Sequence, residues 1–334
     1  MKSNLIFASF LLALGVNAPD IPILFNFSSS QFANTLNGNA ATSSYWTSSY
    51  ITGTNLEQYF LVSHILISAD NTTLYSASIL DLNDPSNYQS CIASSEESAL
   101  HDGSILEATF DGKGFESLTE DNVSQMRTFS NCEGVKFNII YNATSMALVD
   151  GGTGLFTFGN GESYEWGFPS CYTEGTLIAG GKEVVIDPEN SFTWYDRQWN
   201  DGLPSNGNWT WFELHILESK SKLSIWAIDD EKPHQRYRFA TIRREDGSQN
   251  VVPATFIPDY TRHWYSNASD TLYALDWTVA IGSFATLRIS SVTEDQEITG
   301  PAGATGGYEG FVTLNGDFDG EMVDGFGLVE IAYI

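Results

Sequence analysis

The chain has 334 residues, of which 15 are Lys or Arg and 42 are Asp or Glu, so its formal net charge at neutral pH is −27. A hydrophobic fraction of 42% is enough for a folded core and excludes a disordered chain. The excess of acid argues against binding to nucleic acid or to anionic membrane surfaces, because both attract clustered Lys and Arg.

The N-terminus has the pattern of a secretory signal peptide. Lys2 is the only charged residue before Asp20, and residues 5–15 form an apolar run. The run is too short to span a bilayer and fits the hydrophobic region of a signal peptide. We expect residues 1–18 to be removed after Ala18; the alternative is a buried N-terminal strand. No later stretch is apolar over the roughly 18 residues of a membrane span, so we expect none in the mature chain.

Six Asn-x-Ser/Thr sequons agree with passage through the secretory pathway. Each one is weak evidence in a chain rich in Asn, Ser and Thr. Together with the N-terminal pattern they predict a secreted, extracellular glycoprotein. The sequons begin at Asn26, Asn71, Asn122, Asn142, Asn208 and Asn267.

Short apolar runs bounded by Gly, Asn, Asp and Ser recur through the rest of the chain, as at 59–67, 209–216 and 284–289. Helical periodicity is almost absent, so the pattern predicts an all-β sandwich or barrel. The turn residues at 180–190 mark the best domain boundary. We therefore expect an N-terminal β domain, a sandwich or partial barrel, over 19–187 and a second β domain over 188–334.

Three cysteines predict one disulfide and one free thiol in an oxidising compartment. Cys91 and Cys132 are available to pair, and Cys171 then fits a buried thiol better than a nucleophile. The five histidines lack the spacing of a metal site, and there is no Cys-x-x-Cys. Glycine motifs for nucleotide phosphates are also absent from the sequence. We predict chemistry without a cofactor.

The segment 191–200 mixes aromatic side chains with an Asp-Arg pair. In a strand, Asp196 and Gln198 face one side, and Arg197 and Trp199 face the other. One interpretation is an ion pair or hydrogen-bonded knot between domains. The other places Asp196 or Gln198 in a cavity, where it exchanges a proton with a ligand oxygen. Both remain open.

Trp209, Trp211, Glu213 and His215 share one face of a strand over 209–216. Two exposed tryptophans on a wet surface would be unusual. Lining a pocket, they would offer flat rings beside an acid and a base. The alternative is a hydrogen-bonded pair buried between the domains. We take Asp196, Glu213 and His215 as candidate catalytic residues.

Further clusters combine aromatic and polar side chains, and each is more often core than ligand site. As candidate substrate-binding residues, together with Gln198 and Trp211, we take Tyr45, Trp46, His64, Trp166, His263 and Trp264.

Parts of both halves resemble a known family. The element 196–199 and the glycine-spaced meander from Tyr308 to Glu330 are similar to the lipocalin-related carotenoid-hydratase/AttH-type group, as is 43–49 leading into 59–64. The resemblance covers a minority of positions. It implies a lipocalin-like C-terminal barrel and a ligand cavity inside or between the halves. Fungal branches of the group include secreted hydratases of the kievitone-hydratase type and Diels-Alderases of natural-product pathways.

Residues and resemblance together predict a cofactor-independent fungal enzyme that acts on an apolar, conjugated small molecule. The leading hypothesis is dehydration, (hetero-)Diels-Alder cyclisation, or both, of a polyketide or terpenoid. The alternatives are a hydratase that adds water to an alkenyl side chain and a non-catalytic lipocalin-like binder of apolar molecules.

Overall fold

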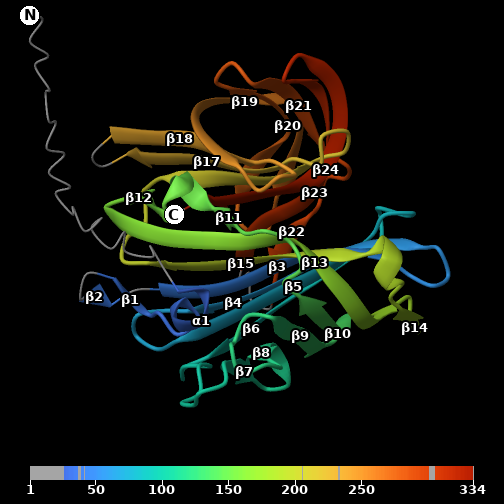
Figure 1. Ribbon diagram of the computed structural model, residues 1–334. Coiled ribbons are helices and arrows are strands. Elements are labelled where there is room, and N and C mark those ends of the chain that lie inside the picture. Colours follow the sequence, from blue (N-terminus) through green and yellow to red (C-terminus); the bar gives the residue numbers. More distant parts are fainter. Residues whose placement is uncertain are drawn as a thin grey trace, which may run out of the picture.

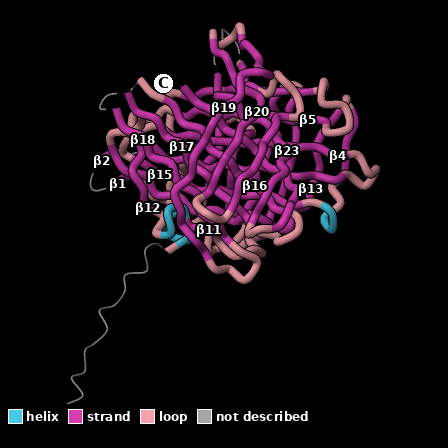
Figure 2. Tube along the Cα trace, turned by 90° about the horizontal axis from the view of Figure 1, so that it is seen from above, coloured by secondary structure: helices cyan, strands magenta, loops and turns pink. Residues whose placement is uncertain are grey.

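The computed structural model describes residues 26–36, 39–40, 42–204, 206–231, 234–300 and 305–333. The expected signal peptide, 1–18, lies outside the described residues. Strand makes up most of the described chain (Figure 2). Within this part of the chain, no helix is long and apolar enough to cross a membrane.

The first sheet contains thirteen strands of the described chain, mostly from its N-terminal half (Figure 1). Its main path runs through β6 (Tyr88–Ser95), β5 (Thr73–Asp81), β4 (Gln58–Ile67), β3 (Thr42–Thr52), β15 (Phe192–Asn200), β13 (Gly161–Ala179), β10 (Val135–Asn142), β9 (Gln125–Cys132), β8 (Lys113–Ser117) and β7 (Glu107–Phe110). Three short strands pair with β13: β11 (Leu148–Val149), β12 (Leu155–Phe158) and β14 (Lys182–Val185). Before it come α1 (Phe27–Ser30), β1 (Thr35–Leu36) and β2 (Asn39–Ala40).

The second sheet contains nine strands of the described chain and curls into a nearly closed barrel, seen above the first sheet in Figure 1. An additional pairing of β21 with β23 closes the curl. The order is β21 (Ala285–Ser291), β20 (Thr271–Ile281), β19 (Gln249–Ser266), β18 (His234–Arg243), β17 (Lys222–Glu231), β16 (Asn208–Ile216), β24 (Glu321–Tyr333), β23 (Thr305–Phe318) and β22 (Glu297–Thr299). These two sheets confirm the predicted all-β fold.

The change of sheet falls later than the sequence predicted. β15 pairs with β3 and β13 of the first sheet, so the segment 192–200 does not belong to the second unit. The passage between sheets lies between β15 and β16 rather than at 187. Both strands are rich in tryptophan because both contribute to the layer between the sheets. Their similar composition is the reason that the sequence analysis placed them in the same domain.

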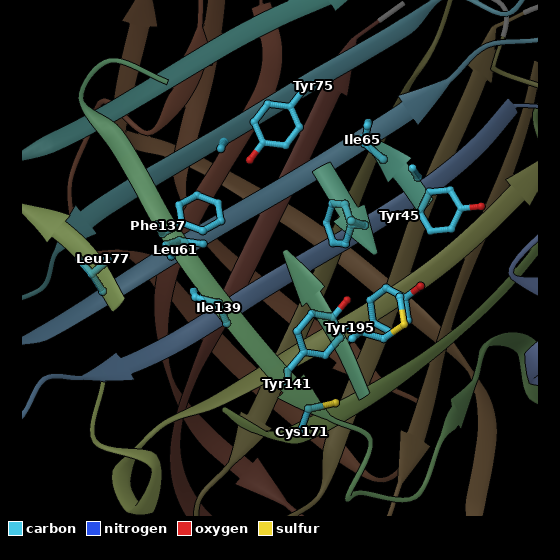
Figure 3. Packing of buried hydrophobic residues seen from close by; sticks show 14 of the residues in the cluster. Tyr45, Leu61, Ile65, Tyr75, Phe137, Ile139, Tyr141, Cys171, Leu177 and Tyr195 are labelled. Carbon is cyan, nitrogen blue, oxygen red and sulfur yellow. The ribbon is translucent and has the colours of Figure 1, made fainter. Parts of the chain in front are cut away.

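Three apolar clusters fill the molecule. The first packs on one side of the first sheet and includes Leu61, Phe137 and Tyr195 (Figure 3). The second fills the barrel, where β16 contributes Phe212 and Leu214. The third joins the two sheets and contains Trp46, Trp194, Trp211, Phe311 and Leu328. Because alternate residues of a strand face opposite sides, β15 and β16 each supply two layers.

Cys91 of β6 and Cys132 of β9 form a disulfide, with their Cα atoms 6.4 Å apart. Cys171 is a free, buried thiol on β13. Of the predicted sequons, Asn26, Asn71 and Asn267 are exposed. Asn122 is buried, and its side-chain amide donates to the carbonyl of Ser104.

Candidate active site between the two sheets

A cavity of about 180 Å³ lies in the layer between the two sheets. Both sheets line it, through β3, β4, β12, β13 and β15 on one side and β16, β17 and β24 on the other. Leu203, an exposed side chain that follows β15, also lines it. Its aromatic walls are Trp46, Phe158, Trp209, Trp211 and Trp226, its carboxyl groups are Glu165, Asp196 and Glu330, and its other polar side chains include Ser44, His64 and Gln198.

Strand register assembles the part of the site that belongs to the first sheet. Asp196 of β15 lies opposite Trp46 of β3, which in turn lies opposite His64 of β4. Two positions along, Gln198 lies opposite Ser44. These side chains point to the same side of the sheet because two is the side-chain period of a strand. Five of the predicted site residues reach the cavity: Trp46, His64, Asp196, Gln198 and Trp211.

Arg197 points away from the cavity, and its contacts lie within the N-terminal half of the chain rather than between the two sheets. Its guanidinium donates to the carbonyls of Ser44 and Ala33 and lies 4.3 Å from the ring centre of Tyr45. These contacts tie the N-terminal segment to the first sheet. Asp196 and Gln198, on the opposite face of β15, line the cavity.

Asp196 is a buried carboxyl with a neutral partner. Its Oδ1 accepts a hydrogen bond of 2.9 Å from Nε1 of Trp194. Burial raises the pKa of Asp196 well above its usual value, and the charge of Asp150 adds to the effect. Burial therefore favours the protonated, neutral form of this carboxyl. Gly167 leaves room for it, since a Cβ there would lie 2.1 Å from Oδ1 of Asp196.

The second sheet contributes a row of large side chains. Glu330 lies opposite Trp211, and Trp211 lies opposite Trp226. Oε1 of Glu330 accepts a bond of 2.9 Å from Nε1 of Trp209, and burial raises the pKa of Glu330 to about 7. The third tryptophan of the row, Trp226, has an indole nitrogen that makes no hydrogen bond within the described chain.

Two further carboxyl groups stand behind the cavity wall. Glu309 lies opposite Glu330 and accepts a bond of 2.9 Å from Nε1 of Trp46. Burial, and then the charge of Glu330, raises the pKa of Glu309 well above its usual value. Asp150 accepts a bond from the hydroxyl of Ser224, and burial raises the pKa of Asp150 to about 7.

Glu165 completes the acidic lining on β13. Its Oε2 accepts a bond of 3.2 Å from Nε2 of Gln198. Burial raises the pKa of Glu165 well above its usual value, with the charges of Asp150 and Asp196 adding to the effect. The described residues contain no group of three or more His, Cys, Asp or Glu side chains that could hold a metal ion.

His64 supplies a neutral imidazole to the cavity. Its Nε2 lies 2.9 Å from the hydroxyl oxygen of Ser44, which also lines the cavity. Burial lowers the pKa of His64 to about 4, so the ring carries no charge near pH 7. Together the imidazole and the hydroxyl can orient a water molecule or a ligand hydroxyl.

Glu213 and His215 do not line this cavity. Glu213 accepts bonds from the hydroxyls of Ser48 and Tyr50, at 2.6 and 2.9 Å, and its Oε1 lies 3.0 Å from Nε2 of His215. Nδ1 of His215 lies 2.6 Å from Nζ of Lys222. Glu213 thus bonds to β3 of the first sheet, whereas the contacts of His215 with Glu213 and Lys222 lie within the second sheet. The structure places the pair in a hydrogen-bonded contact outside the cavity, and their catalytic role stays a prediction.

Four other candidates also lie elsewhere. Tyr45 is buried in the first cluster, where its hydroxyl donates to the carbonyl of Gln31. Trp166 is in the same cluster, with its Nε1 bonded to Ser30. His263 is exposed on β19, and Trp264 packs on Tyr273 at the barrel. The strand period separates Tyr45 from Trp46 and Trp166 from Glu165, so of the candidates Tyr45, Trp46 and Trp166 only Trp46 reaches the cavity.

Sequence reasoning missed Glu165, Glu309, Glu330 and Asp150. Strand alternation gives only Glu309 an aromatic neighbour on its own face, Phe311, whereas small or aliphatic residues flank Glu165 and Glu330. The local pattern therefore did not distinguish these glutamates in a chain with 42 acidic residues.

Comparison with known proteins agrees with the predicted resemblance. A family described as AttH-like matches residues 86–332. Kievitone hydratase of Fusarium solani subsp. phaseoli is 44% identical over 94% of this chain and 87% of its own. Dehydratase asqC of Emericella nidulans is 38% identical over 94% of this chain and 90% of its own.

Solved structures match across nearly the whole chain. The crystal structure of kievitone hydratase from Nectria haematococca aligns with a TM-score of 0.86 at 40% identity, covering 96% of this chain and 95% of that one. The structure of CghA with Sch210972 aligns with a TM-score of 0.54 at 9% identity over 88% of each chain, which shows a shared fold alone. On this evidence the chain belongs to the AttH-like family.

Proposed function

We propose that this protein adds water to, or removes water from, a carbon–carbon double bond of an apolar small molecule held between its two sheets. The relatives of high identity are named as a hydratase and a dehydratase, which are the two directions of this reaction. The observation that carries the proposal is the position of Asp196, a buried carboxyl at the wall of a tryptophan-lined cavity, where burial raises its pKa.

A neutral carboxyl is the group that this reaction requires. In hydration, Asp196 gives its proton to one alkene carbon while a water oxygen bonds to the other, and the proton released by that water returns to the carboxylate. In dehydration, Asp196 protonates the leaving hydroxyl, the C–O bond breaks, and the proton lost from the adjacent carbon restores the acid. Each cycle balances with water as the only other reactant.

The imidazole of His64 and the hydroxyl of Ser44 position the water. Their 2.9 Å contact lies in the same cavity as Asp196. Ser44 is on the strand next to that of Asp196, and His64 is on the strand after it. Orienting the attacking water removes rotational freedom that the reaction would otherwise have to lose in its transition state. His64 is a positioning residue in this scheme, and Asp196 is the catalytic residue.

The size of the cavity favours reaction at one end of a substrate. Pockets that enclose a drug-sized ligand have volumes of about 300–1,000 Å³, whereas this cavity measures about 180 Å³. An alkenyl side chain fits inside while the rest of the molecule lies beside the exposed side chain of Leu203. Ring closure of a long polyene needs both reacting ends inside, so (hetero-)Diels-Alder cyclisation is the second candidate, as a step that follows loss of water.

The experiment incubates the full chain in ¹⁸O-labelled water with kievitone, with alkenyl phenols and with the corresponding alcohols. Hydration incorporates one labelled oxygen, dehydration releases one water, and ring closure gives an unlabelled isomer. We expect Asp196→Asn to lose about 10²- to 10⁴-fold in rate. The matched variant Asp276→Asn, at a half-exposed carboxyl bonded to Arg262, should keep the wild-type rate. Quenching of tryptophan fluorescence without turnover of any substrate would instead support a non-catalytic binder.

A further inference from the structure

We propose that the inter-sheet cavity recognises positive charge on its ligand, so that it binds hydrophobic organic cations and stabilises a carbon that becomes cationic during reaction. The second half of this statement rests on the proposed function. The first half concerns binding alone and stands independently.

The carboxyl groups around the cavity have no cationic partner. The donors to Glu330 and Glu309 are the indoles of Trp209 and Trp46, and the donor to Glu165 is the amide of Gln198. Asp196 and Asp150 receive the indole of Trp194 and the hydroxyl of Ser224. No Lys or Arg is among the described residues that line the cavity. Any proton lost from this group leaves a negative charge that only a ligand can balance.

Indole rings form the walls that such a ligand would touch. Trp211 and Trp226 are stacked with ring centres 5.8 Å apart, and Trp46 meets Trp211 edge-on at 5.2 Å. The face of an indole carries partial negative charge and attracts an ammonium group or a carbocation more strongly than other aromatic rings do. Four tryptophans line the described cavity, so ring faces and carboxyl groups act in the same direction.

Two buried polar atoms at the site lack a hydrogen-bond partner among the described residues. Oδ2 of Asp150 is an acceptor without a donor, and Nε1 of Trp226 is a donor without an acceptor. Both side chains are more than nine-tenths buried, and Trp226 lines the cavity. The carboxyl of Glu165 nevertheless interacts with both side chains. Trp226 and Asp150 therefore belong to the same acidic group at the cavity, and neither brings a Lys or Arg to it.

The same features argue against a negatively charged intermediate. Loss of water through an enolate requires donors that stabilise an oxyanion. Any carboxyl group that has lost its proton would repel it, and no Lys or Arg is among the described residues that line the cavity. The substrate class that we expect is an alkene or alcohol whose reacting carbon is tertiary, allylic or benzylic.

The test compares two probes of equal shape, benzyltrimethylammonium and the neutral neopentylbenzene, by quenching of tryptophan fluorescence of the full chain between pH 5 and pH 8. Glu330 and Asp150, whose pKa values are about 7, lose protons over this range. We expect the ammonium to bind at least tenfold more tightly at pH 8 than at pH 5, with protons released on binding. The affinity for neopentylbenzene should not change with pH.

The variant Glu330→Gln should weaken binding of the ammonium and leave neopentylbenzene unaffected, which also shows that the cavity remains folded. Equal affinity for the two probes at pH 8, or ammonium binding that is independent of pH, would overturn the proposal. Turnover is measured separately in labelled water. Hydratase activity without cation preference rejects this inference alone, and cation preference without turnover rejects the proposed function alone.

Discussion

The indole of Trp194 donates a hydrogen bond of 2.9 Å to the carboxyl of Asp196, two positions further along the same strand. Both side chains face the second sheet because alternate residues of a strand share a side. The bond holds Oδ1 of a carboxyl that lines the cavity. It also lowers the pKa of Asp196, against the larger upward effect of burial. A single strand thus supplies the acid and the group that orients it.

Replacing Trp194 by Phe removes this donor and keeps a ring in the layer between the sheets. The pKa of Asp196 should rise further, and its carboxyl should lose its fixed orientation. We expect the rate to fall about 10- to 100-fold, with the alkaline limb of the pH profile of kcat/KM shifted to higher pH. An alkaline limb that stays in place in the variant would contradict this role.

Glu213 and Asp196 are both buried carboxyl groups, but only Asp196 lines the cavity. Glu213→Gln keeps an acceptor for Ser48 and Tyr50, so we expect less than about a tenfold change in rate, in contrast to the 10²- to 10⁴-fold loss for Asp196→Asn. Steady-state rates of the two variants, with folding checked by circular dichroism, provide the comparison. Equal losses would return Glu213 to the catalytic group.

Gly167 provides the space that Asp196 and Trp194 occupy. A Cβ at this position would lie 2.1 Å from Oδ1 of Asp196 and 2.8 Å from Nε1 of Trp194. Gly167→Ala should displace the carboxyl and reduce the rate by roughly 10²-fold. Gly103→Ala, where the nearest atom is 3.5 Å from the new Cβ, is the matched control and should behave as wild type. A fully active Gly167→Ala would show that the carboxyl position is not critical.

The buried carboxyl groups should make stability depend on pH. Burial raises the pKa of Asp150 and Glu330 to about 7, and that of Glu213 to about 8, from usual values near 4. The unfolded chain releases these protons first as pH rises. The free energy of unfolding should therefore be highest below about pH 4 as far as these groups contribute, and fall up to about pH 7–8.

Each pKa unit corresponds to about 1.4 kcal/mol. Urea unfolding at pH 5 and pH 8 measures the decrease, and Glu330→Gln should make it smaller because the amide does not titrate. A free energy of unfolding that rises over this range in the wild type would be incompatible with neutral buried carboxyl groups.

The sequence predicted which side chains share a face of a strand better than it predicted what that face packs against. Alternation in the strands at 192–200 and 209–216 correctly grouped Asp196 with Gln198 and Trp211 with Glu213. It could not distinguish a residue at the cavity from one sealed two positions away, because Trp211 lines the space and Glu213 is closed off by Ser48 and Tyr50 of a distant strand. Partners of this kind depend on register between strands that are more than a hundred residues apart.

The local sequence pattern also could not predict to which of the two sheets β15 belongs. An aromatic-rich strand pairs equally well with either sheet, and only the register of β15 with β3 brings Asp196 beside Trp46. Glu165 shows the same limit, since its role arises from Gln198 and Asp150 rather than from its sequence neighbours. Fold class was accessible because turns and strand period are local properties.

The most direct measurement of the central claim is infrared difference spectroscopy on the wild type and Asp196→Asn near pH 7. A protonated carboxyl has a C=O stretch separate from that of a carboxylate. We predict that the wild type shows a protonated carboxyl band at this pH that is missing in the variant. The absence of such a difference, with Asp196 already ionised at pH 7, would contradict its assignment as the proton donor.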